Sequence, residues 1–188
     1  MNNPFLIGKK IYLRSLENDD LSNLLKWLND EKITHYLQQG DRPPTIEILK
    51  DTYDVEGKNL SQISFAVIDK KSNKHIGWTG LYEINWLSRN AEMRIFVGDK
   101  NFWRKGIAYE SQKLLTEYSF DKLNLHRIHA GTNIECMGEQ GALKKLFFTK
   151  EGISKDGMYR NGKYYDLIHF GLLKNQYLKK IRDGMWKK

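Results

Sequence analysis

One helix enclosed between two strands is the feature of this sequence that most limits its fold. Residues 106–123 carry apolar side chains at helical spacing, and the segments at 91–97 and 126–131 on either side read as strands. When two strands of one sheet flank a helix in this way, the connection between them is a parallel, right-handed crossover. The spacing therefore predicts a layered α/β (α+β) domain in which this helix covers one face of the sheet.

The remaining periodic segments predict a mixed sheet. Further strands are expected at 11–14, 63–68, 76–82 and 164–173, and further helices at 18–29, from about 45, and at 138–147. The polar turn at 70–74 predicts that the strands around it form a hairpin. The three consecutive strands between 63 and 97 are therefore expected to be antiparallel, next to the parallel crossover.

The charge of the chain is concentrated at its end. The 188 residues have a formal net charge of +8, and residues 174–188, with six basic residues and one acidic residue, contribute +5. We interpret residues 1–173 as a single domain and 174–188 as a basic C-terminal tail, expected to be a solvated end. Because little of the charge excess lies in the domain itself, a nucleic-acid partner is not required.

Several classes of protein are disfavoured by composition. No apolar run approaches the roughly 20 residues that a bilayer requires, and the N-terminus lacks the pattern of a signal peptide. The single cysteine, Cys136, cannot form an internal disulfide, and the five histidines show no metal-ligand spacing. We expect a cytoplasmic protein with no metal and no membrane partner.

The loop before the central helix carries the clearest chemical signal. It contains Arg104, Lys105 and Gly106, and the helix begins directly after them. Free N–H groups at a helix N-terminus attract anions, and Gly106 and Ala108 allow phosphate oxygens to approach the backbone. The spacing is neither a P-loop nor a three-glycine dinucleotide motif. From these residues alone, a phosphate cradle and a plain helix start are both open.

The same segment resembles motif A of the GCN5-related N-acetyltransferases, the GNAT superfamily. Residues 103–108 stand in the register of the Arg/Gln-x-x-Gly-x-Gly/Ala signature. Trp103 replaces the usual Arg or Gln, as is common in the RimJ/RimL-like branch that acetylates ribosomal-protein N-termini. Five further segments resemble that branch in the right order, and together they span nearly the whole chain. They are residues 11–14, 91–95, 123–128, 145–152 and 162–166.

The resemblance implies the GNAT fold, a mixed sheet of six or seven strands flanked by helices, with acetyl-CoA as co-substrate. Its fourth and fifth strands would splay apart to admit the pantetheine arm, which would pair with one strand edge as an added strand. The pyrophosphate would lie on the N–H groups of residues 104–108. The cofactor-binding residues implied in this way are Ile95, Phe96, Val97, Trp103, Arg104, Lys105, Gly106, Ile107, Ala108 and, from a neighbouring segment, Asn133.

The activity implied is transfer of an acetyl group from acetyl-CoA to a primary amine by direct attack in a ternary complex. The acceptor is a small-molecule or peptide amine: a protein N-terminus, a polyamine, an amino sugar or an antibiotic. Glu92, in the strand at 91–97, is the candidate general base, taking a proton from the amine through water. The alternative is that Glu92 only pairs with a basic residue such as Arg94 or Arg127.

Two departures from the family pattern leave the general acid unassigned. Cys136 and Glu139 stand where the family often has Asn and Ser, and Leu143 stands where it often has the Tyr that protonates the leaving thiolate. The alternative function is therefore a non-catalytic CoA-binding sensor or scaffold with the same fold. Cys136 is interpreted as a buried or half-buried thiol rather than a nucleophile, which would need a base and a lowered pKa. A nucleic-acid binder is the least favoured reading, and a homodimer is left open.

Overall fold

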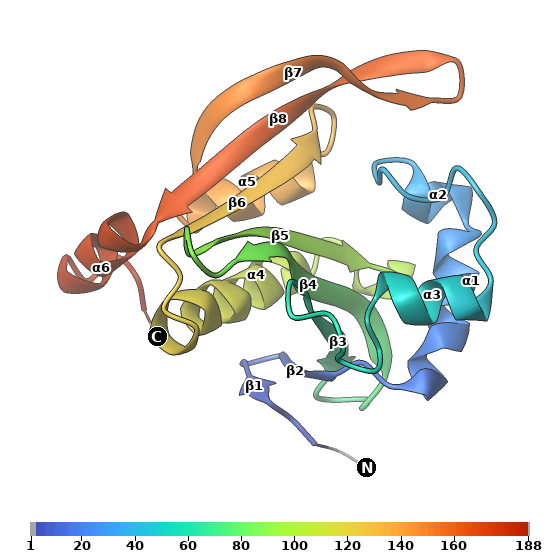
Figure 1. Ribbon diagram of the computed structural model, residues 1–188, viewed down its shortest axis with the longest axis horizontal. Coiled ribbons are helices and arrows are strands. Elements are labelled where there is room, and N and C mark those ends of the chain that lie inside the picture. Colours follow the sequence, from blue (N-terminus) through green and yellow to red (C-terminus); the bar gives the residue numbers. More distant parts are fainter. Residues whose placement is uncertain (1–2, 188) are drawn as a thin grey trace.

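The computed structural model describes residues 3–187 and contains one eight-stranded sheet with helices on both faces (Figure 1). The strand order across the sheet is β1-β2-β3-β4-β5-β6-β8-β7. The strands are β1 (Leu6–Ile7), β2 (Ile11–Ser15), β3 (Ile63–Asp69), β4 (His75–Asn85), β5 (Asn90–Val97), β6 (Arg127–Asn133), β7 (Thr149–Arg160) and β8 (Lys163–Leu173). The helices are α1 (Leu21–Leu28), α2 (Glu31–Thr34), α3 (Ile46–Thr52), α4 (Ile107–Glu117), α5 (Met137–Lys145) and α6 (Lys174–Arg182).

The predicted mixed topology is confirmed. All neighbouring strands are antiparallel except β5 and β6, which are parallel and joined through α4. The sheet has eight strands, rather than six or seven, because it also includes the two-residue β1 and the long β7. The strand β7 is missed by sequence reasoning because most of its side chains are exposed, so it lacks a buried, alternating apolar face.

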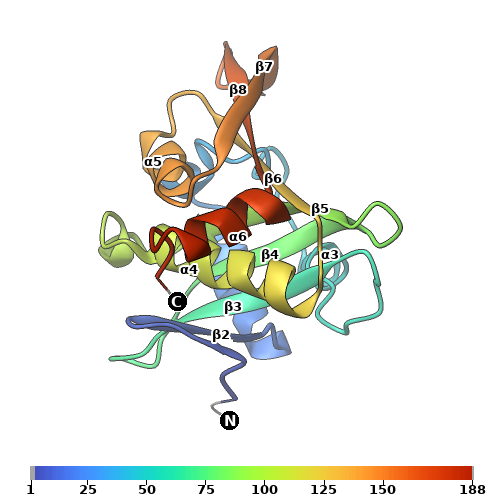
Figure 2. The same cartoon turned by 90° about the vertical axis from the view of Figure 1, so that its left-hand side faces the viewer.

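Two hydrophobic cores lie on opposite faces of the sheet. Side chains of β2, β3 and β4 that point to one side, such as Tyr12, Ala66 and Trp78, pack against α1 and α3. Side chains of the opposite parity, such as Leu13 and Val67, pack in the core that also contains residues of α4, α5 and α6. In Figure 2, α6 lies in front of α4. This alternation follows from the two-residue period of strands.

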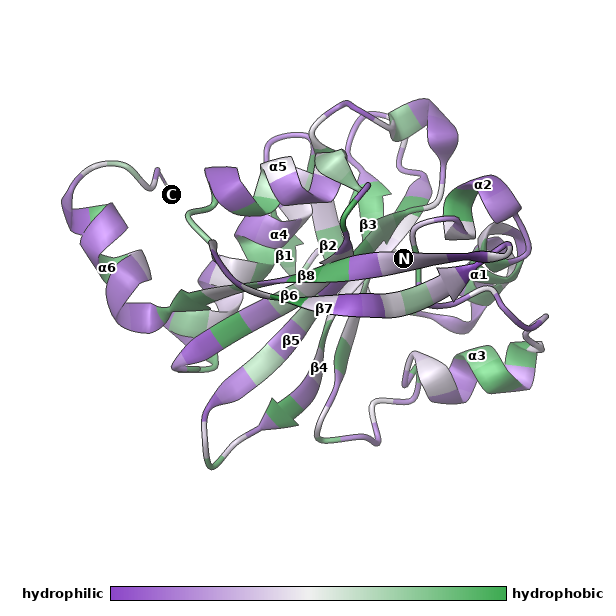
Figure 3. Cartoon of the chain, turned by 90° about the horizontal axis from the view of Figure 1, so that it is seen from above, coloured by the Kyte–Doolittle hydropathy of each residue, from purple (hydrophilic) through white to green (hydrophobic). Residues whose placement is uncertain are grey.

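The C-terminal segment differs from the expected solvated tail. Residues 174–182 form α6, whose surface is largely hydrophilic (Figure 3). However, Tyr177 is fully buried and Trp186 is 6% exposed, and both belong to the core beside Phe120. The indole of Trp186 donates a hydrogen bond to Glu117 of α4 at 2.8 Å. The basic residues of this segment therefore surround two aromatic anchors that the charge count does not reveal.

The strands β5 and β6 separate after a short contact. Their pairing covers Asn90–Glu92 and Arg127–His129 and then ends, although both strands continue. Beyond that point β6 pairs with β8 only, so the sheet divides into two wings with a gap between β5 and β6 (Figure 1). The predicted splay of these two strands is thus present in the fold.

Candidate active site

A cavity of about 260 Å³ occupies the gap between β5 and β6. Its floor and sides come from β4, β5, β6, β8 and α5, and a partial roof comes from the connection between α2 and α3. Three kinds of side chain line it. The charged or titratable ones include Glu92, Arg94, His129, Glu139 and His169, and the aromatic ones are Tyr36, Trp78 and Phe96. The hydroxyl and amide side chains are Gln38, Gln39, Thr132 and Asn133.

The roof of the cavity is held by the tip of the β7–β8 hairpin, which reaches toward α2 (Figure 1). The guanidinium of Arg160 donates hydrogen bonds to the carbonyls of Leu37 at 2.7 Å and Gln39 at 2.8 Å. The neighbouring Asn161 donates to Glu31. Two segments more than 100 residues apart are thereby joined across the cavity.

Glu92 lies at the point where the two strands separate, because it is the last residue of β5 that pairs with β6. Its carboxylate forms an ion pair with Arg94, whose guanidinium also stacks over the ring of Tyr82 at 4.7 Å. Arg94, one of the two basic residues expected to pair with Glu92, is therefore its partner. Arg127, the other candidate partner, instead pairs with Glu151. Glu92 nevertheless lines the cavity, so the pair with Arg94 and contact with a substrate are compatible.

A second carboxyl group, that of Glu139, enters the cavity from α5. It accepts a hydrogen bond from the Thr132 hydroxyl at 2.8 Å. Burial raises the pKa of Glu139 to about 7, and the nearby charge of Glu92 acts in the same direction. Sequence reasoning noted Glu139 only as a departure from the family pattern. The sequence signal that could have revealed it is that Glu139, an acidic residue, lies one helical turn before the apolar Leu143 and so on the same face of the helix.

Cys136 precedes α5 and is partly buried. Burial raises the pKa of its thiol. A thiol of this kind is a poor nucleophile at neutral pH, because the thiolate is the reactive form. The structure therefore agrees with the interpretation of Cys136 as a half-buried thiol.

The edge of β5 that faces the gap has free backbone positions. The N–H of Gly98 donates to the carbonyl of Ile76, which makes the Gly77–Val97 pair a non-hydrogen-bonded one. Backbone groups of Ile95 and Val97 therefore point away from β4 and into the gap. Those of Phe96 point toward β4, and its side chain packs in the core with α1. Of the three edge residues predicted to meet a cofactor, Phe96 is thus the exception as far as its backbone is concerned.

The loop before α4 has the geometry of an anion cradle. Gly106 has φ +80°, and a Cβ at this position would meet no atom within 4 Å. Among residues 3–187, no acceptor takes the backbone N–H groups of residues 104–108. The loop is braced by Lys10, which donates its ammonium to the carbonyl of Lys105 at 2.8 Å and its backbone N–H to Glu110 at 2.8 Å. The free N–H groups, the open space and the helix N-terminus together fit a pyrophosphate.

Trp103 and Asn133 have structural partners in addition to their predicted contact with a cofactor. The indole of Trp103 donates to the carbonyl of Val97 at 2.7 Å and the ring remains 41% exposed. This bond ties the loop to the end of β5 and takes one of the edge acceptors. The side chain of Asn133 accepts from the N–H of Glu135 at 2.8 Å and donates to the sulfur of Met158. Asn133 thus organises the turn that leads into α5.

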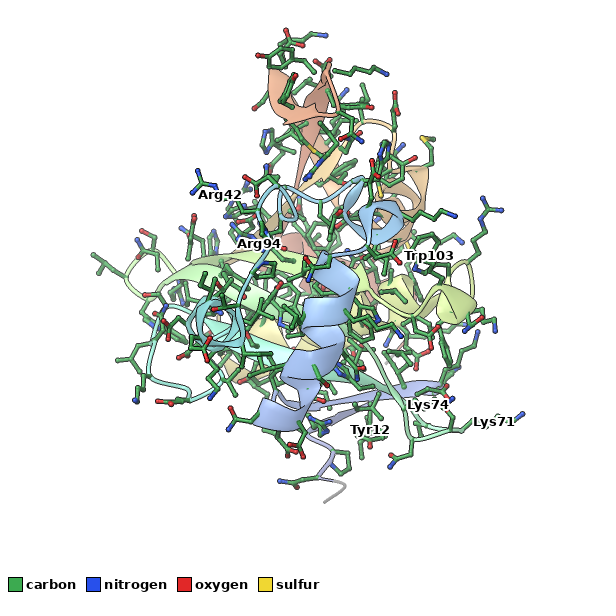
Figure 4. The ribbon with its side chains drawn as sticks, turned by 90° about the vertical axis from the view of Figure 1, so that its right-hand side faces the viewer. Tyr12, Arg42, Lys71, Lys74, Arg94 and Trp103 are labelled. Atoms are coloured by element: carbon green, nitrogen blue, oxygen red, sulfur yellow. The ribbon has the colours of Figure 1, made fainter. Side chains whose placement is uncertain are left out.

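A second, wider cavity of about 910 Å³ lies beside the cradle at the same end of the sheet. Three loops meet there: the β1–β2 turn, the β3–β4 turn and the loop before α4. They contribute a group of cations, of which Lys71 and Lys74 are labelled in Figure 4: Lys9, Lys10, Lys70, Lys71, Lys74, Arg104 and Lys105. This positive surface favours a polyanionic ligand such as CoA.

No helix within residues 3–187 has the length and apolar character that crossing a bilayer requires. Within the same residues, no three or more His, Cys, Asp or Glu side chains cluster as metal ligands.

Comparison with known proteins identifies the family. The model of the acetyltransferase (GNAT) domain matches residues 10–149. The chain belongs to the GNAT acetyltransferases. It is 30% identical to the uncharacterized N-acetyltransferase p20 of Bacillus licheniformis over 92% of this chain and 97% of that protein. It is 29% identical to spermidine N(1)-acetyltransferase of Escherichia coli K12 over 89% of this chain and 88% of that protein.

Solved structures agree with this assignment. The crystal structure of spermidine N-acetyltransferase from Vibrio cholerae, in complex with CoA and spermine, superposes with a TM-score of 0.82 at 27% identity. It covers 91% of this chain and 99% of the Vibrio chain. The GNAT enzyme described here is therefore a transferase, an N-acetyltransferase that uses acetyl-CoA as co-substrate and an amine as acceptor.

Proposed function

We propose that this GNAT enzyme acetylates a primary amine of a small aliphatic polyamine. The observation that supports this most strongly is the cavity at the splay, whose lining combines the Glu92 carboxylate, paired with Arg94, with the aromatic side chains Tyr36, Trp78 and Phe96. Carboxylates and aromatic faces both attract alkylammonium groups. The roof clamped by Arg160 limits the cavity to about 260 Å³, which suits a slender acceptor.

Relatives support the same acceptor class. Both the Escherichia coli and the Vibrio cholerae proteins are named for spermidine, and the Vibrio complex contains spermine. The RimJ/RimL-like resemblance favours a protein N-terminus instead, and a putative ribosomal N-acetyltransferase, YdaF of Bacillus subtilis, is 24% identical. We favour the polyamine because residues 36–39 cover part of the cavity, whereas a peptide needs an open groove to continue beyond its N-terminus.

An acceptor panel tests this proposal. We expect acetyl transfer to spermidine and spermine with kcat/KM at least ~100-fold above that for short peptides with free N-termini, since a missing favourable contact of about 2.7 kcal/mol corresponds to that ratio. The measurement is the rate at which free CoA thiol forms, with mass spectrometry to identify the acetylated amine. Peptides acetylated faster than polyamines would contradict the proposal and favour the RimJ/RimL-like branch.

The residues that hold acetyl-CoA are proposed from the same geometry. The N–H groups of residues 104–108 would bind the pyrophosphate, and Arg104 and Lys105 add charge there. The backbone of Ile95 and Val97 would pair with the pantetheine arm. Acetyl-CoA supplies an acyl group activated as a thioester. The protein then has to hold the amine against it, keep the amine neutral and move protons.

Glu92 is proposed to receive the proton of the acceptor ammonium through water. We expect Glu92→Gln to lower kcat/KM about 100-fold, because general base catalysis typically contributes that factor or more. Glu83→Gln is the matched control, since Glu83 also faces Arg94, at 3.9 Å, but its side chain is exposed. Steady-state kinetics of both variants at several pH values is the measurement. Equal activity of Glu92→Gln and wild type would mean that Glu92 only pairs with Arg94.

A further inference from the structure

Glu139 is placed where a proton can be exchanged inside the site. It lines the cavity from α5, on the side of the gap opposite Glu92, and its carboxyl is fixed by the Thr132 hydroxyl at 2.8 Å. One turn further along the same face of α5 lies Leu143, which is fully buried and has no ionisable group. Glu139 is thus the titratable side chain that α5 directs into the cavity.

The surroundings of Glu139 favour its protonated form. Burial is the main cause of the raised pKa of about 7, and the Thr132 hydroxyl opposes it by stabilising the carboxylate. Three of the groups around it carry like charge or become negative when ionised, and the others are basic. The titratable and charged groups that face it or share the cavity are Tyr36 from the connection between α2 and α3, Glu92 and Arg94 on β5, His129 on β6, Cys136 before α5, and His169 on β8.

The two carboxyl groups of the cavity therefore have different environments. Glu92 is ion-paired with Arg94, whereas Glu139 has a neutral hydroxyl as its hydrogen-bond partner. Separated environments for two carboxyl groups in one site are the usual physical basis for dividing acid and base roles. Other candidates for an acid fit less well, because burial raises the pKa of the Cys136 thiol and lowers the pKa of His129.

We propose that Glu139 is the general acid of the acetyl transfer, donating its carboxyl proton to the sulfur that leaves as the new amide bond forms. As the amine nitrogen bonds to the acyl carbon, the carbon–sulfur bond breaks and its electron pair goes to sulfur, which takes the proton of Glu139. The amine nitrogen loses one proton to water, and the Glu139 carboxylate regains one from water. The reaction then releases CoA as a thiol and consumes no net proton. This inference rests on amine acetylation but not on the identity of the amine.

The variant Glu139→Gln tests this role with little change of shape. The Gln carbonyl can still accept from Thr132, but the amide cannot act as an acid. We expect kcat at saturating substrates to fall about 100-fold, within the usual range for general acid–base catalysis, while the Kd for acetyl-CoA changes less than ~3-fold. In the wild type, kcat should decrease as pH rises through about 7, and this alkaline limb should be absent from Glu139→Gln.

Two readouts on the free protein do not depend on catalysis. Carbon-13 NMR of labelled Glu carboxyl groups should show one resonance that titrates near pH 7 and is missing from Glu139→Gln. Folding raises the pKa of Glu139 above its ordinary 4.5, so the ionised form is disfavoured in the folded state. Wild-type stability should therefore fall as pH rises from about 4.5 to about 7, and the Tm of Glu139→Gln should lack this fall.

Glu135→Gln is the matched control, because Glu135 is exposed on the same connection and pairs with Lys163. It should keep both kcat and the alkaline limb. Unchanged kcat and an unchanged alkaline limb in Glu139→Gln would overturn the proposal, as would a carboxyl that titrates only near its ordinary value. The role of Glu139 and the identity of the amine are tested separately. If polyamines are not the acceptors, the acceptor panel will show it, and the titration of Glu139 and the kinetics with another amine can still be measured.

Discussion

Gly106→Val should abolish acetyl-CoA binding, with at least a ~100-fold increase in Kd, while the protein stays folded. Gly106 has φ +80°, a conformation that a β-branched residue adopts only at a cost of about 1–3 kcal/mol. The space around its Cβ position is empty in the protein, so the new side chain would occupy room proposed for the pyrophosphate. The loss should therefore appear in binding rather than in packing.

Thermal unfolding with and without acetyl-CoA measures this effect. A ligand at about 100-fold above its Kd stabilises the folded state by roughly 2.7 kcal/mol, which raises the Tm of a domain of this size by about 5–10 °C. We expect that shift for the wild type with acetyl-CoA but not with ATP, and no shift for Gly106→Val.

The matched control for this prediction is Gly57→Val. Gly57 has φ +66° and equally open surroundings, but it lies in the connection between α3 and β3. Its variant should carry a similar strain and still respond to acetyl-CoA. Retained micromolar binding by Gly106→Val would contradict the cradle assignment, and the loop would then be only a helix start.

Trp186→Ala should destabilise the protein by about 3–5 kcal/mol, as expected for loss of a large buried aromatic side chain. Trp186 is 6% exposed, packs edge-on against Tyr177 with ring centroids 4.9 Å apart, and donates to Glu117. Its removal leaves a cavity between α6 and the end of α4. Glu117 retains Lys113 as an ion-pair partner, so no buried charge is left alone.

Urea unfolding of Trp186→Ala, Trp186→Phe and Leu178→Ala tests this prediction. Trp186→Phe keeps an aromatic ring and loses the indole N–H, so its loss of stability should be intermediate. Leu178→Ala is the control on α6, because Leu178 is 48% exposed and should cost less than about 1 kcal/mol. If Trp186→Ala and Leu178→Ala lowered stability equally, α6 would be a solvated appendage as the charge count suggested.

The strand and helix order was largely predictable because it depends on local periodicity. The crossover through α4, the hairpin of β3 and β4 and the start of α5 all follow from spacing within short windows. The longest elements that were not predicted, β7 and α6, have few buried apolar residues, so their local pattern is weak. Their positions depend on partners elsewhere: β8 for one and the Phe120 region for the other.

The proposed cofactor site could be predicted from a single segment of sequence, whereas the proposed catalytic site could not. Gly106 and the basic residues beside it form one contiguous segment, and therefore one motif. Glu92, Glu139 and His129 come from β5, α5 and β6, and only the separation of the strands brings them to one cavity. The direction of the Phe96 backbone likewise depends on its register with β4, which one strand alone does not define.

The layered α/β class and the glycine-containing helix entry at residues 104–108 follow from the sequence alone, as do, through the resemblance, the GNAT family and its co-substrate. These features are encoded in short, contiguous patterns of apolar spacing, glycine and charge. Three features are visible only in the folded chain: Glu139 is a partly buried carboxyl group at the gap, Arg160 holds the residues that cover the cavity, and Trp186 anchors the C-terminal segment. Burial and hydrogen-bond partners depend on residues distant in the chain, so local patterns carry no record of them.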